Sequence, residues 1–232
     1  MITISLCMIV KNEQDVIARC LESVKDIADE IIIVDTGSSD KTVEIASHYT
    51  QNIYHFDWID DFSAARNFSF SKATKEYILW LDADDIIEPK YQKEFITLKQ
   101  TLPHTIDIVM LPYHVAFDEN NQAIHSYYRE RLLKRESNFK WLGAVHEAIT
   151  PNGNVVFKKV AISHKKIHPF DPDRNIRIFE KLLSEGQNLE PRQQFYYARE
   201  LYYHNRYDEA ISLFKQFLKE QKGWKENNIS AC

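Results

Sequence analysis

The sequence predicts an α/β fold, with a mostly parallel mixed sheet flanked by helices, followed by a small α-helical region. Apolar runs that do not alternate with polar residues, such as Tyr77–Leu81, are typical of strands buried on both faces. Segments with helical spacing separate the early runs, which favours right-handed crossovers between parallel strands. From Asp173 onward the pattern is helical throughout.

The first half of the chain alternates between strands and helices. The helix after the first strand carries apolar residues at helical spacing from Val16 to Val24, with Asn12 as a possible N-cap. Strands are expected over residues 2–10, 31–34, 52–56 and 77–81, and further helices over 40–49 and 61–72.

After a helix expected over residues 90–102, the sequence pattern changes from alternating strands and helices to a series of short strands. Short strands are predicted over residues 106–111, 113–117, 129–133, 139–141 and 155–160, with turn signals between them. Pro169 and Pro172 mark a linker. We therefore expect an α/β domain over residues 1–168 and a helical region over residues 169–232, with helices over 175–185, 192–204 and 208–222.

Composition limits the function classes. The 232 residues are 44% hydrophobic, enough for a sizeable core, and the net charge of -5 gives no general electrostatic case for nucleic acid or an anionic membrane. Three cysteines, an odd number without metal-site spacing, argue against a disulfide framework and favour a reducing, cytoplasmic compartment. No stretch has the length of a membrane span or the pattern of a signal peptide.

Two carboxylates follow the most apolar strand, at the sheet edge where α/β proteins bind ligands. In extended chain Asp82 and Asp84 point the same way, with the small Ala83 between them. Such a pair can hold a hard divalent cation against a diphosphate, and one member can reach a ribose hydroxyl. An Asp-x-Asp alone is more often an acidic turn, as the match at Asp171–Asp173 in the linker illustrates.

Two further polar side chains are expected near this edge. Asp35 ends the second strand in an Asp-Thr-Gly-Ser-Ser-Asp turn, where its carboxylate can accept hydrogen bonds from a base or a ribose. Arg66 opens the helix before the central strand and offers a rigid donor fork for diphosphate oxygens or a base carbonyl. The simpler interpretation of Asp35 is an ordinary βα turn, and the simpler interpretation of Arg66 is a solvated helix face.

The second half offers a candidate base and a candidate metal ligand. His146 and Glu147 follow a turn at Gly143, and a carboxylate placed there could act as general base; the alternative is a surface loop anchored by Trp141. His164 follows the last predicted strand and is a candidate third metal ligand, although a lone histidine is more often structural.

Four of these motifs, in this order and spacing, resemble the family 2 glycosyltransferases with the nucleotide-sugar-binding GT-A fold. The resemblance covers roughly the first two-thirds of the chain, through residues 7–13, 33–40, 65–67 and 81–84. It implies an inverting transfer from a nucleotide diphosphate sugar, usually a UDP-sugar, with Mg²⁺ or Mn²⁺. This chain lacks the Gln-x-x-Arg-Trp signature of processive polysaccharide synthases, which favours an enzyme that adds one sugar.

The resemblance also implies roles for individual residues. Val10, Asn12 and Glu13 would lie near the base, Asp35 would hold uracil or ribose, and Arg66 the nucleotide. Asp82 would hold ribose or metal, and Asp84 the metal, with His164 as a further ligand. The loop over residues 143–147 resembles the acceptor-side loop of the family, which makes Glu147 the expected base, although the usual Glu-Asp pair is absent here.

The helical region resembles one tetratricopeptide repeat. Ala198 and Ala210 are the small residues where two helices cross, and Tyr207, Phe214 and Phe217 are expected to fill the gap between them. One repeat cannot bury its outer face. We therefore expect further repeats beyond residue 232, packing on the catalytic domain, or contact with another subunit, such as a homodimer.

A family 2 domain followed by such a repeat resembles the bacterial glycocin-type enzymes that glycosylate peptides. The acceptor is accordingly expected to be a peptide, a protein or a glycan. Two other classes stay open: a sugar nucleotidyltransferase, which would need a glycine-rich loop where this chain has Lys11–Glu13, and a non-catalytic tetratricopeptide-type scaffold that binds a peptide.

Overall fold

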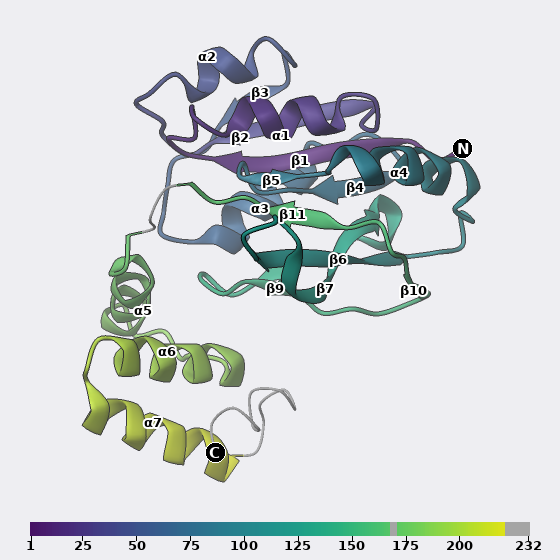
Figure 1. Cartoon of the computed structure of the whole chain (residues 1–232). Coiled ribbons are helices and arrows are strands. Elements are labelled where there is room, and N and C mark those ends of the chain that lie inside the picture. Colours follow the sequence, from purple (N-terminus) through teal and green to yellow (C-terminus); the bar gives the residue numbers. More distant parts are fainter. Residues whose placement is uncertain (168–170, 221–232) are drawn as a thin grey trace. The chain divides into compact units, whose positions relative to one another are not determined.

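The computed structural model describes residues 1–167 and 171–220, which form two compact units. The first unit comprises residues 1–59, 64–141 and the described part of 149–169 (Figure 1). The second comprises residues 60–63, 142–148 and the described part of 170–232. The domain boundary predicted between residues 168 and 169 lies outside the described residues.

A mixed, mostly parallel sheet forms the first unit, as predicted. Its described strands follow the order β3-β2-β1-β4-β7-β6-β11-β5, and β10 pairs with β6. The first four of these run parallel to one another, and β7 joins them antiparallel to β4. The strand bounds are β1 (Ile4–Val10), β2 (Glu30–Asp35), β3 (Ile53–His55), β4 (Tyr77–Trp80), β5 (Asp85–Ile86), β6 (Ile108–Phe117), β7 (Ala123–Lys134), β10 (Val155–Phe157) and β11 (Ile162–His164). A separate two-stranded sheet pairs β8 (Trp141–Leu142) with β9 (Ala148–Ile149).

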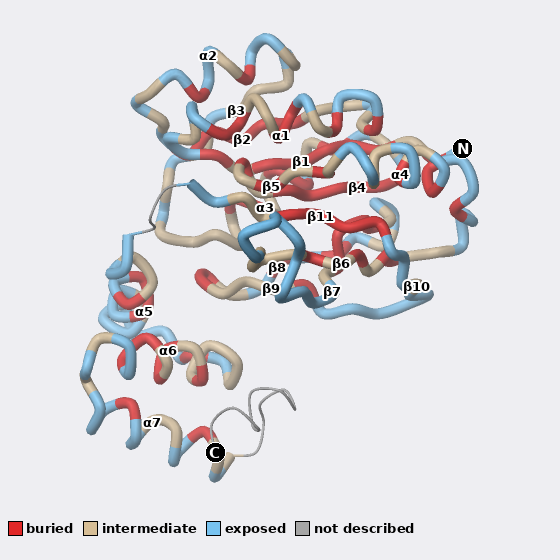
Figure 2. Tube along the Cα trace, in the orientation of Figure 1, coloured by how far each residue is buried: buried red, intermediate tan, exposed pale blue. Residues whose placement is uncertain are grey.

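Two hydrophobic cores cover the two faces of this sheet. Helices α1 (Ile17–Val24), α2 (Thr42–Ala46) and α4 (Pro89–Thr101) contribute side chains to one core. Helix α3 (Phe62–Ser71) contributes Phe70 to the other, and the short 3-10 helix η1 (Arg135–Ser137) follows β7. Figure 2 shows the strands between them as mostly buried, in agreement with the non-alternating apolar runs.

The prediction of two strands separated at Pro112 is wrong, because β6 continues through this residue. Pro112 lies between the two partners that β6 has on one side: β10 pairs as far as Met110, and β11 pairs from Tyr113. A proline is tolerated where no neighbouring strand needs its missing N–H group. The strand predicted over residues 155–160 ends at Phe157, and His164 belongs to a separate strand, β11, that was not predicted.

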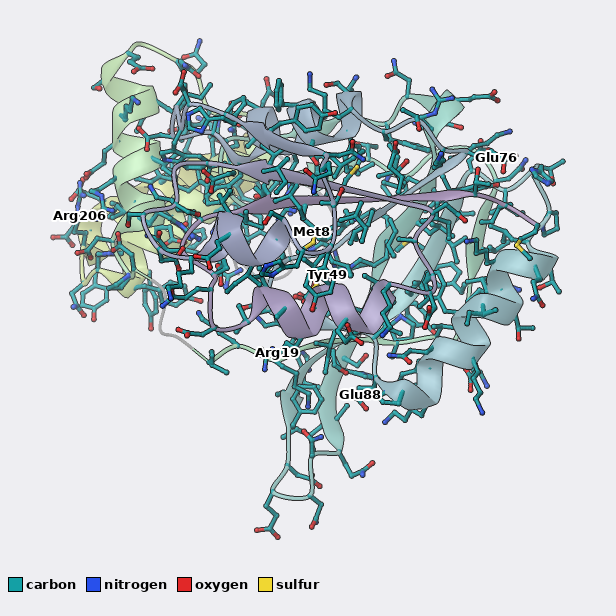
Figure 3. All side chains as sticks on the ribbon, turned by 90° about the horizontal axis from the view of Figure 1, so that it is seen from above. Met8, Arg19, Tyr49, Glu76, Glu88 and Arg206 are labelled. Atoms are coloured by element: carbon teal, nitrogen blue, oxygen red, sulfur yellow. The ribbon has the colours of Figure 1, made fainter. Side chains whose placement is uncertain are left out.

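Strand β7 extends well past its neighbour β4. Pairing with β4 is confined to Leu132–Lys134, whereas pairing with β6 continues to Ala123. The resulting hairpin projects from the sheet (Figure 3, pale teal). Among the described residues, no strand therefore pairs with the β4-side edge of β7 over residues 123–131, although the Glu130 carbonyl accepts a hydrogen bond from Trp80 Nε1.

The second unit contains helices α5 (Arg174–Ser184), α6 (Pro191–Tyr203) and α7 (Tyr207–Glu220). Ala198 and Ala210 are buried, in agreement with their predicted place at the crossing of α6 and α7. The prediction that Tyr207 fills the gap is wrong, since this residue is 49% exposed. Phe195 supplies the filling ring instead, with ring centres 5.9 Å and 5.7 Å from those of Phe214 and Phe217.

No helix in the described ranges 1–167 and 171–220 is long and apolar enough to cross a membrane.

Candidate active site

The carboxyl ends of β1, β2 and β4 bring most of the predicted site residues to one edge of the sheet. Val10, the last residue of β1, is in register with Asp35, the last residue of β2. On the other side of β1, Cys7 is in register with Trp80, the last residue of β4, and Asp82 follows two residues later. The parallel register therefore explains why residues far apart in the sequence share this edge.

Hydrogen bonds join the loop after β1 to the loop after β2. Asn12 has a φ of 54°; its N–H donates to Ser38 Oγ at 3.0 Å, and its Oδ1 accepts from Ser39 N–H at 2.8 Å. Glu13 N–H donates to Thr42 Oγ1 at 2.6 Å. The prediction of Asn12 as a helix N-cap is therefore wrong: α1 begins at Ile17 without a side-chain cap, and the Asn12 side chain bonds to the neighbouring loop.

Asp35 is held by neutral donors. Its carboxylate accepts the N–H groups of Gly37 at 3.2 Å and of Ser38 at 3.1 Å, which closes the turn predicted there. Gly37 has a φ of 100°, a backbone conformation that favours glycine. The Val10 carbonyl accepts both the N–H and the hydroxyl of Thr36, so Val10 takes part in this edge through its backbone.

Arg66 and Asp82 form a partly buried ion pair. Arg66 Nη2 donates to Asp82 Oδ1 at 2.8 Å, and its guanidinium lies 5.1 Å from the ring centre of Trp80 and 4.9 Å from that of Trp141. Arg66 is 8% exposed, so the simpler interpretation of a solvated helix face is excluded. Burial by itself raises the pKa of Asp82, but Arg66 and Arg131 outweigh it and hold that pKa well below its usual range.

Residues 82–85 form a turn, contrary to the extended chain expected there. Asp85 N–H donates to the Asp82 carbonyl at 3.0 Å, and Asp82 N–H donates to Asp85 Oδ2, also at 3.0 Å. The buried Cys20 on α1 also approaches the Asp82 carbonyl. The turn gives Asp82 and Asp84 different partners, Arg66 for the former and His164 for the latter.

A cluster of carboxylates and imidazole follows this turn. His164 Nδ1 lies 3.2 Å from Asp84 Oδ1 and 3.2 Å from Asp85 Oδ1, and the candidate ligand atoms of the three residues lie within 4.8 Å of one another. Carboxylates with an imidazole are donors that suit Mg²⁺ or Mn²⁺, so these residues could hold such an ion. Burial alone lowers the pKa of His164, but the two carboxylates outweigh it and raise the pKa to about 10. A divalent ion there would compete with that proton.

Sequence reasoning missed Arg131 as a member of this site. It is fully buried in β7, and its Nη1 donates to Asp85 Oδ2 at 3.0 Å. The available signal was the charged run Arg129–Glu130–Arg131 in a strand whose neighbours, Leu132 and Leu133, must lie inside the sheet.

Glu147 lies in the loop between β8 and β9. It belongs to the second unit, whereas the other predicted site residues belong to the first. The loop turns at Gly143, with a φ of 96°, and is tied to α6 through His146, whose Nε2 lies 2.9 Å from Glu200 Oε1. The His146 ring also stacks on Tyr196, at 4.1 Å between ring centres. The residue next to Glu147 is therefore well anchored, and its role as a base stays a prediction.

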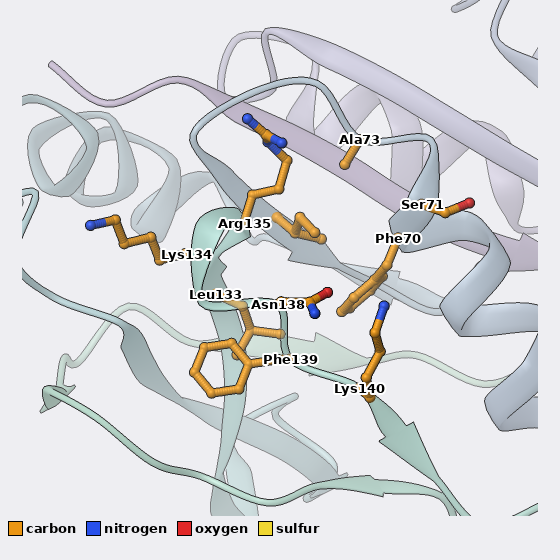
Figure 4. Close-up of a pocket in the computed structure, with 10 residues that line it drawn as sticks. Phe70, Ser71, Ala73, Leu133, Lys134, Arg135, Asn138, Phe139 and Lys140 are labelled. Atoms are coloured by element: carbon orange, nitrogen blue, oxygen red, sulfur yellow. The ribbon is translucent and has the colours of Figure 1, made fainter.

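A separate cavity of about 180 Å³ lies beside the amino-terminal half of β4 (Figure 4). Its lining mixes the apolar Phe70, Leu133 and Phe139 with polar residues that include Asn138 and Lys140. None of the predicted site residues lines it. The cavity is therefore a different feature from the edge that carries Asp82 and Asp84.

Solved structures with the same fold include the Staphylococcus aureus protein TarS, with a TM-score of 0.56 and 14% identity, over 97% of this chain and 50% of that one. Glucosyl-3-phosphoglycerate synthase from Mycobacterium tuberculosis, solved in complex with Mg²⁺ and UDP, gives a TM-score of 0.52 at 16% identity, over 82% of each chain. At such identities the likeness shows the fold alone. It confirms the predicted GT-A-like arrangement of a mixed sheet flanked by helices.

Sequence relatives cover different parts of the chain. Glycosyltransferase SunS of Bacillus phage SPbeta is 31% identical over 234 aligned residues, which cover 95% of this chain and 54% of SunS. A TPR repeat-containing protein of Synechococcus elongatus is 53% identical over 85 residues, or 37% of this chain and 21% of that protein. The chain thus spans about half the length of SunS.

The family model described as glycosyl transferase family 2 matches residues 5–161, which include both carboxylates after β4 and the loops after β1 and β2. This match, together with the SunS similarity, confirms the resemblance inferred from the four motifs. The chain belongs to glycosyl transferase family 2.

Proposed function

We propose that this protein transfers one sugar, with inversion, from a UDP-sugar to a hydroxyl or thiol of a peptide acceptor. The observation that carries the proposal is the buried strand β4 ending in a turn where Asp84 faces His164 and Asp82 is paired with Arg66. Family membership favours sugar transfer over the nucleotidyltransferase and scaffold alternatives. Structures of the same fold have been solved with UDP, which supports the choice of donor.

The donor nucleotide is proposed to lie along the loops after β1 and β2. Asp35 would accept hydrogen bonds from uracil or ribose, while the bonds between Asn12 and the 38–39 segment hold the two loops in place. Val10 and Glu13 would line the same space. Asp82 would orient the ribose while Arg66 offsets its charge.

The diphosphate is proposed to lie near Asp84 and His164, which would hold Mg²⁺ or Mn²⁺. A divalent ion there would offset the negative charge that develops on the leaving diphosphate. Arg66 would add a fixed positive charge on the nucleotide side of the same edge.

Glu147 is proposed as the general base. Its carboxylate would take the proton of the acceptor hydroxyl or thiol as the oxygen or sulfur lone pair forms the bond to the anomeric carbon. The bond from that carbon to the diphosphate oxygen breaks at the same time, and UDP leaves with the electron pair. Attack from the face opposite to UDP inverts the anomeric centre. The peptide as acceptor is supported by the resemblance to glycocin-type enzymes.

The proposal is tested by following UDP release and the mass of the acceptor. The full chain is incubated with Mn²⁺, a panel of nucleotide sugars and peptides that contain cysteine or serine. We expect UDP release with one or more UDP-sugars and a peptide heavier by one sugar. Absence of UDP release with every donor and acceptor tried would overturn the proposal.

Glu147→Gln tests the assigned base in the same assay. Transfer to a hydroxyl should fall by ~10²–10⁴-fold, with donor affinity unchanged, and transfer to a thiol should fall less because a thiol ionises far more readily than an alcohol. Glu136→Gln, a change at an exposed carboxylate outside the proposed site, is the matched control. A Glu147→Gln variant with parental rates on every acceptor would remove the base assignment.

A further inference from the structure

Arg131 occupies a β-bulge next to the candidate metal site. Val109 on β6 is in register with Leu132, whereas the next residue, Met110, is in register with Glu130, so Arg131 is an extra residue without a partner. Such an insertion bends the strand and can re-aim a side chain toward a nearby site. Arg131 is fully buried, and a buried guanidinium needs compensating contacts.

Its guanidinium lies just beyond the end of β4. Nη1 donates to the carbonyl of Trp80, the last residue of that strand, at 3.1 Å. The guanidinium carbon is 3.6 Å from the ring centre of Trp80 and 4.1 Å from that of Tyr113. Trp80 belongs to the core on one face of the sheet and Tyr113 to the core on the other. Arg131 therefore fills the space between the two cores where β4 has ended.

The same Nη1 donates to Asp85, which is fully buried and accepts from several donors. Asp85 also accepts the Tyr113 hydroxyl at 2.9 Å and the Asp82 N–H at 3.0 Å, and it lies 3.2 Å from His164 Nδ1. Protein donors thus surround this carboxylate. A carboxylate of this kind orients neighbouring ligands.

Both candidate ligands depend on Asp85. Its bond to Asp82 N–H fixes the turn that carries Asp84, and its contact with Nδ1 fixes the His164 ring. His164 Nδ1 lies at the same distance, 3.2 Å, from Asp84 Oδ1, so its contact with Asp85 also keeps the imidazole beside the carboxylate of Asp84.

We propose that Arg131 is a positioning residue for the metal site. By holding Asp85, it keeps the 82–85 turn and His164 in the geometry in which Asp84 and His164 bind a divalent cation. This inference rests on the proposed function. In this arrangement Arg66 is paired with Asp82 and Arg131 with Asp85, while Asp84 faces His164.

The direction in which Mn²⁺ affinity changes on loss of Arg131 distinguishes a positioning role from a purely electrostatic one. Removal of a cation near a metal site should tighten Mn²⁺ binding if only charge matters. Loss of a positioning residue should weaken it, by about 10–100-fold for outer partners of metal ligands. We therefore expect Arg131→Met to weaken Mn²⁺ binding to the full chain at least ~10-fold, measured by electron paramagnetic resonance of free Mn²⁺ without donor.

Arg129→Met is the matched control. Arg129 lies on the same strand, 5.0 Å from the Trp80 ring centre, but its carboxylate partner is Glu130 at 3.1 Å. This variant should bind Mn²⁺ as tightly as the parent or more tightly. Equal Mn²⁺ affinity in Arg131→Met and Arg129→Met would overturn the inference.

A double variant keeps the test valid if Arg131→Met folds poorly, since one substitution leaves Asp85 buried without its cation. Arg131→Met with Asp85→Asn removes both charges and should recover the melting temperature. We expect its Mn²⁺ affinity to stay reduced; recovery of stability and affinity together would show a purely structural pair and overturn the inference. A parent chain that binds no Mn²⁺, even with UDP, would instead remove the proposed metal-dependent function.

Discussion

The two halves of the active edge hold their carboxylates in different ways. In the loops after β1 and β2, Asp35 and Asp40 accept hydrogen bonds from backbone N–H groups, and Asp40 also from the Thr42 hydroxyl. After β4, Asp82 and Asp85 are paired with Arg66 and Arg131. The first half uses mainly neutral donors, with the exposed His55 Nδ1 3.8 Å from Asp35 Oδ2, and the second uses buried cations.

The difference follows from the crowding of carboxylates after β4 and from what each half is proposed to bind. Neutral donors fix a carboxylate but leave its negative charge, which suits Asp35 for accepting N–H or O–H groups of a uridine. Three carboxylates within residues 82–85 would repel one another strongly if none had a cationic partner. The nucleotide half should therefore tolerate single losses, whereas the metal half should not.

The largest effect is expected for Asp84→Asn. This change removes a proposed ligand charge while the Asp84 backbone carbonyl keeps its bond from Lys165 N–H, so the fold should survive. Mn²⁺-dependent UDP affinity, measured by calorimetry, should fall by at least ~100-fold, the upper range for changes around metal ligands. Glu119→Gln, in the exposed hairpin turn, is the control. Equal UDP affinity in Asp84→Asn and the parent would contradict the proposed difference between the nucleotide half and the metal half.

A smaller effect is expected for Asn12→Ala. The variant loses the acceptor of Ser39 N–H but keeps the bond from its own N–H to Ser38. One net hydrogen bond contributes about 1 kcal/mol, so UDP affinity should fall roughly fivefold. The dependence on Mn²⁺ should be unchanged, and Asn120→Ala serves as control. A loss of Mn²⁺ dependence would show that the two halves are coupled.

The smallest effect concerns pH and Asp40. Burial raises the pKa of Asp40, but hydrogen bonds from Thr42 and from Gln14 N–H outweigh it and lower the pKa. A depressed pKa contributes stability that is present above the unfolded value, about 3.9, and is lost as pH falls through the folded value. The difference in urea midpoint between the parent and Asp40→Asn should therefore have its maximum value at pH 7 and decrease below about pH 4. The difference for Ser39→Ala, which does not titrate, should stay constant.

Much of the fold was predictable because strands that are buried on both faces consist of uninterrupted apolar residues. The runs at β1, β2 and β4 are apolar without alternation, and the crossovers between them follow from the handedness of the chain. The sheet edge that carries Asp35 and Asp82 followed from this topology. The strand break predicted at Pro112 was wrong because a proline's tolerance in a strand depends on where the neighbouring strands end, which the local sequence does not encode.

Parts of the site could not be predicted from the local sequence. The turn at Asp82–Asp85 is closed by hydrogen bonds between its own ends, whereas an extended chain was expected. Arg131 reaches Asp85 only because a bulge shifts the register of β7 against β6, and a bulge depends on both strands. The bond from Asn12 to Ser39 likewise joins two loops that are distant in sequence.

The overhang of β7 has a consequence for how this protein behaves in concentrated solution. Beyond the end of β4, no described strand pairs with this edge of the segment Ala123–Tyr128, which contains neither lysine nor proline, the residues that commonly block pairing between molecules. Ile124 is 68% exposed and Tyr128 is 44% exposed, so apolar side chains flank the open backbone. Edge-to-edge association of two hairpins is thus the expected first step of aggregation.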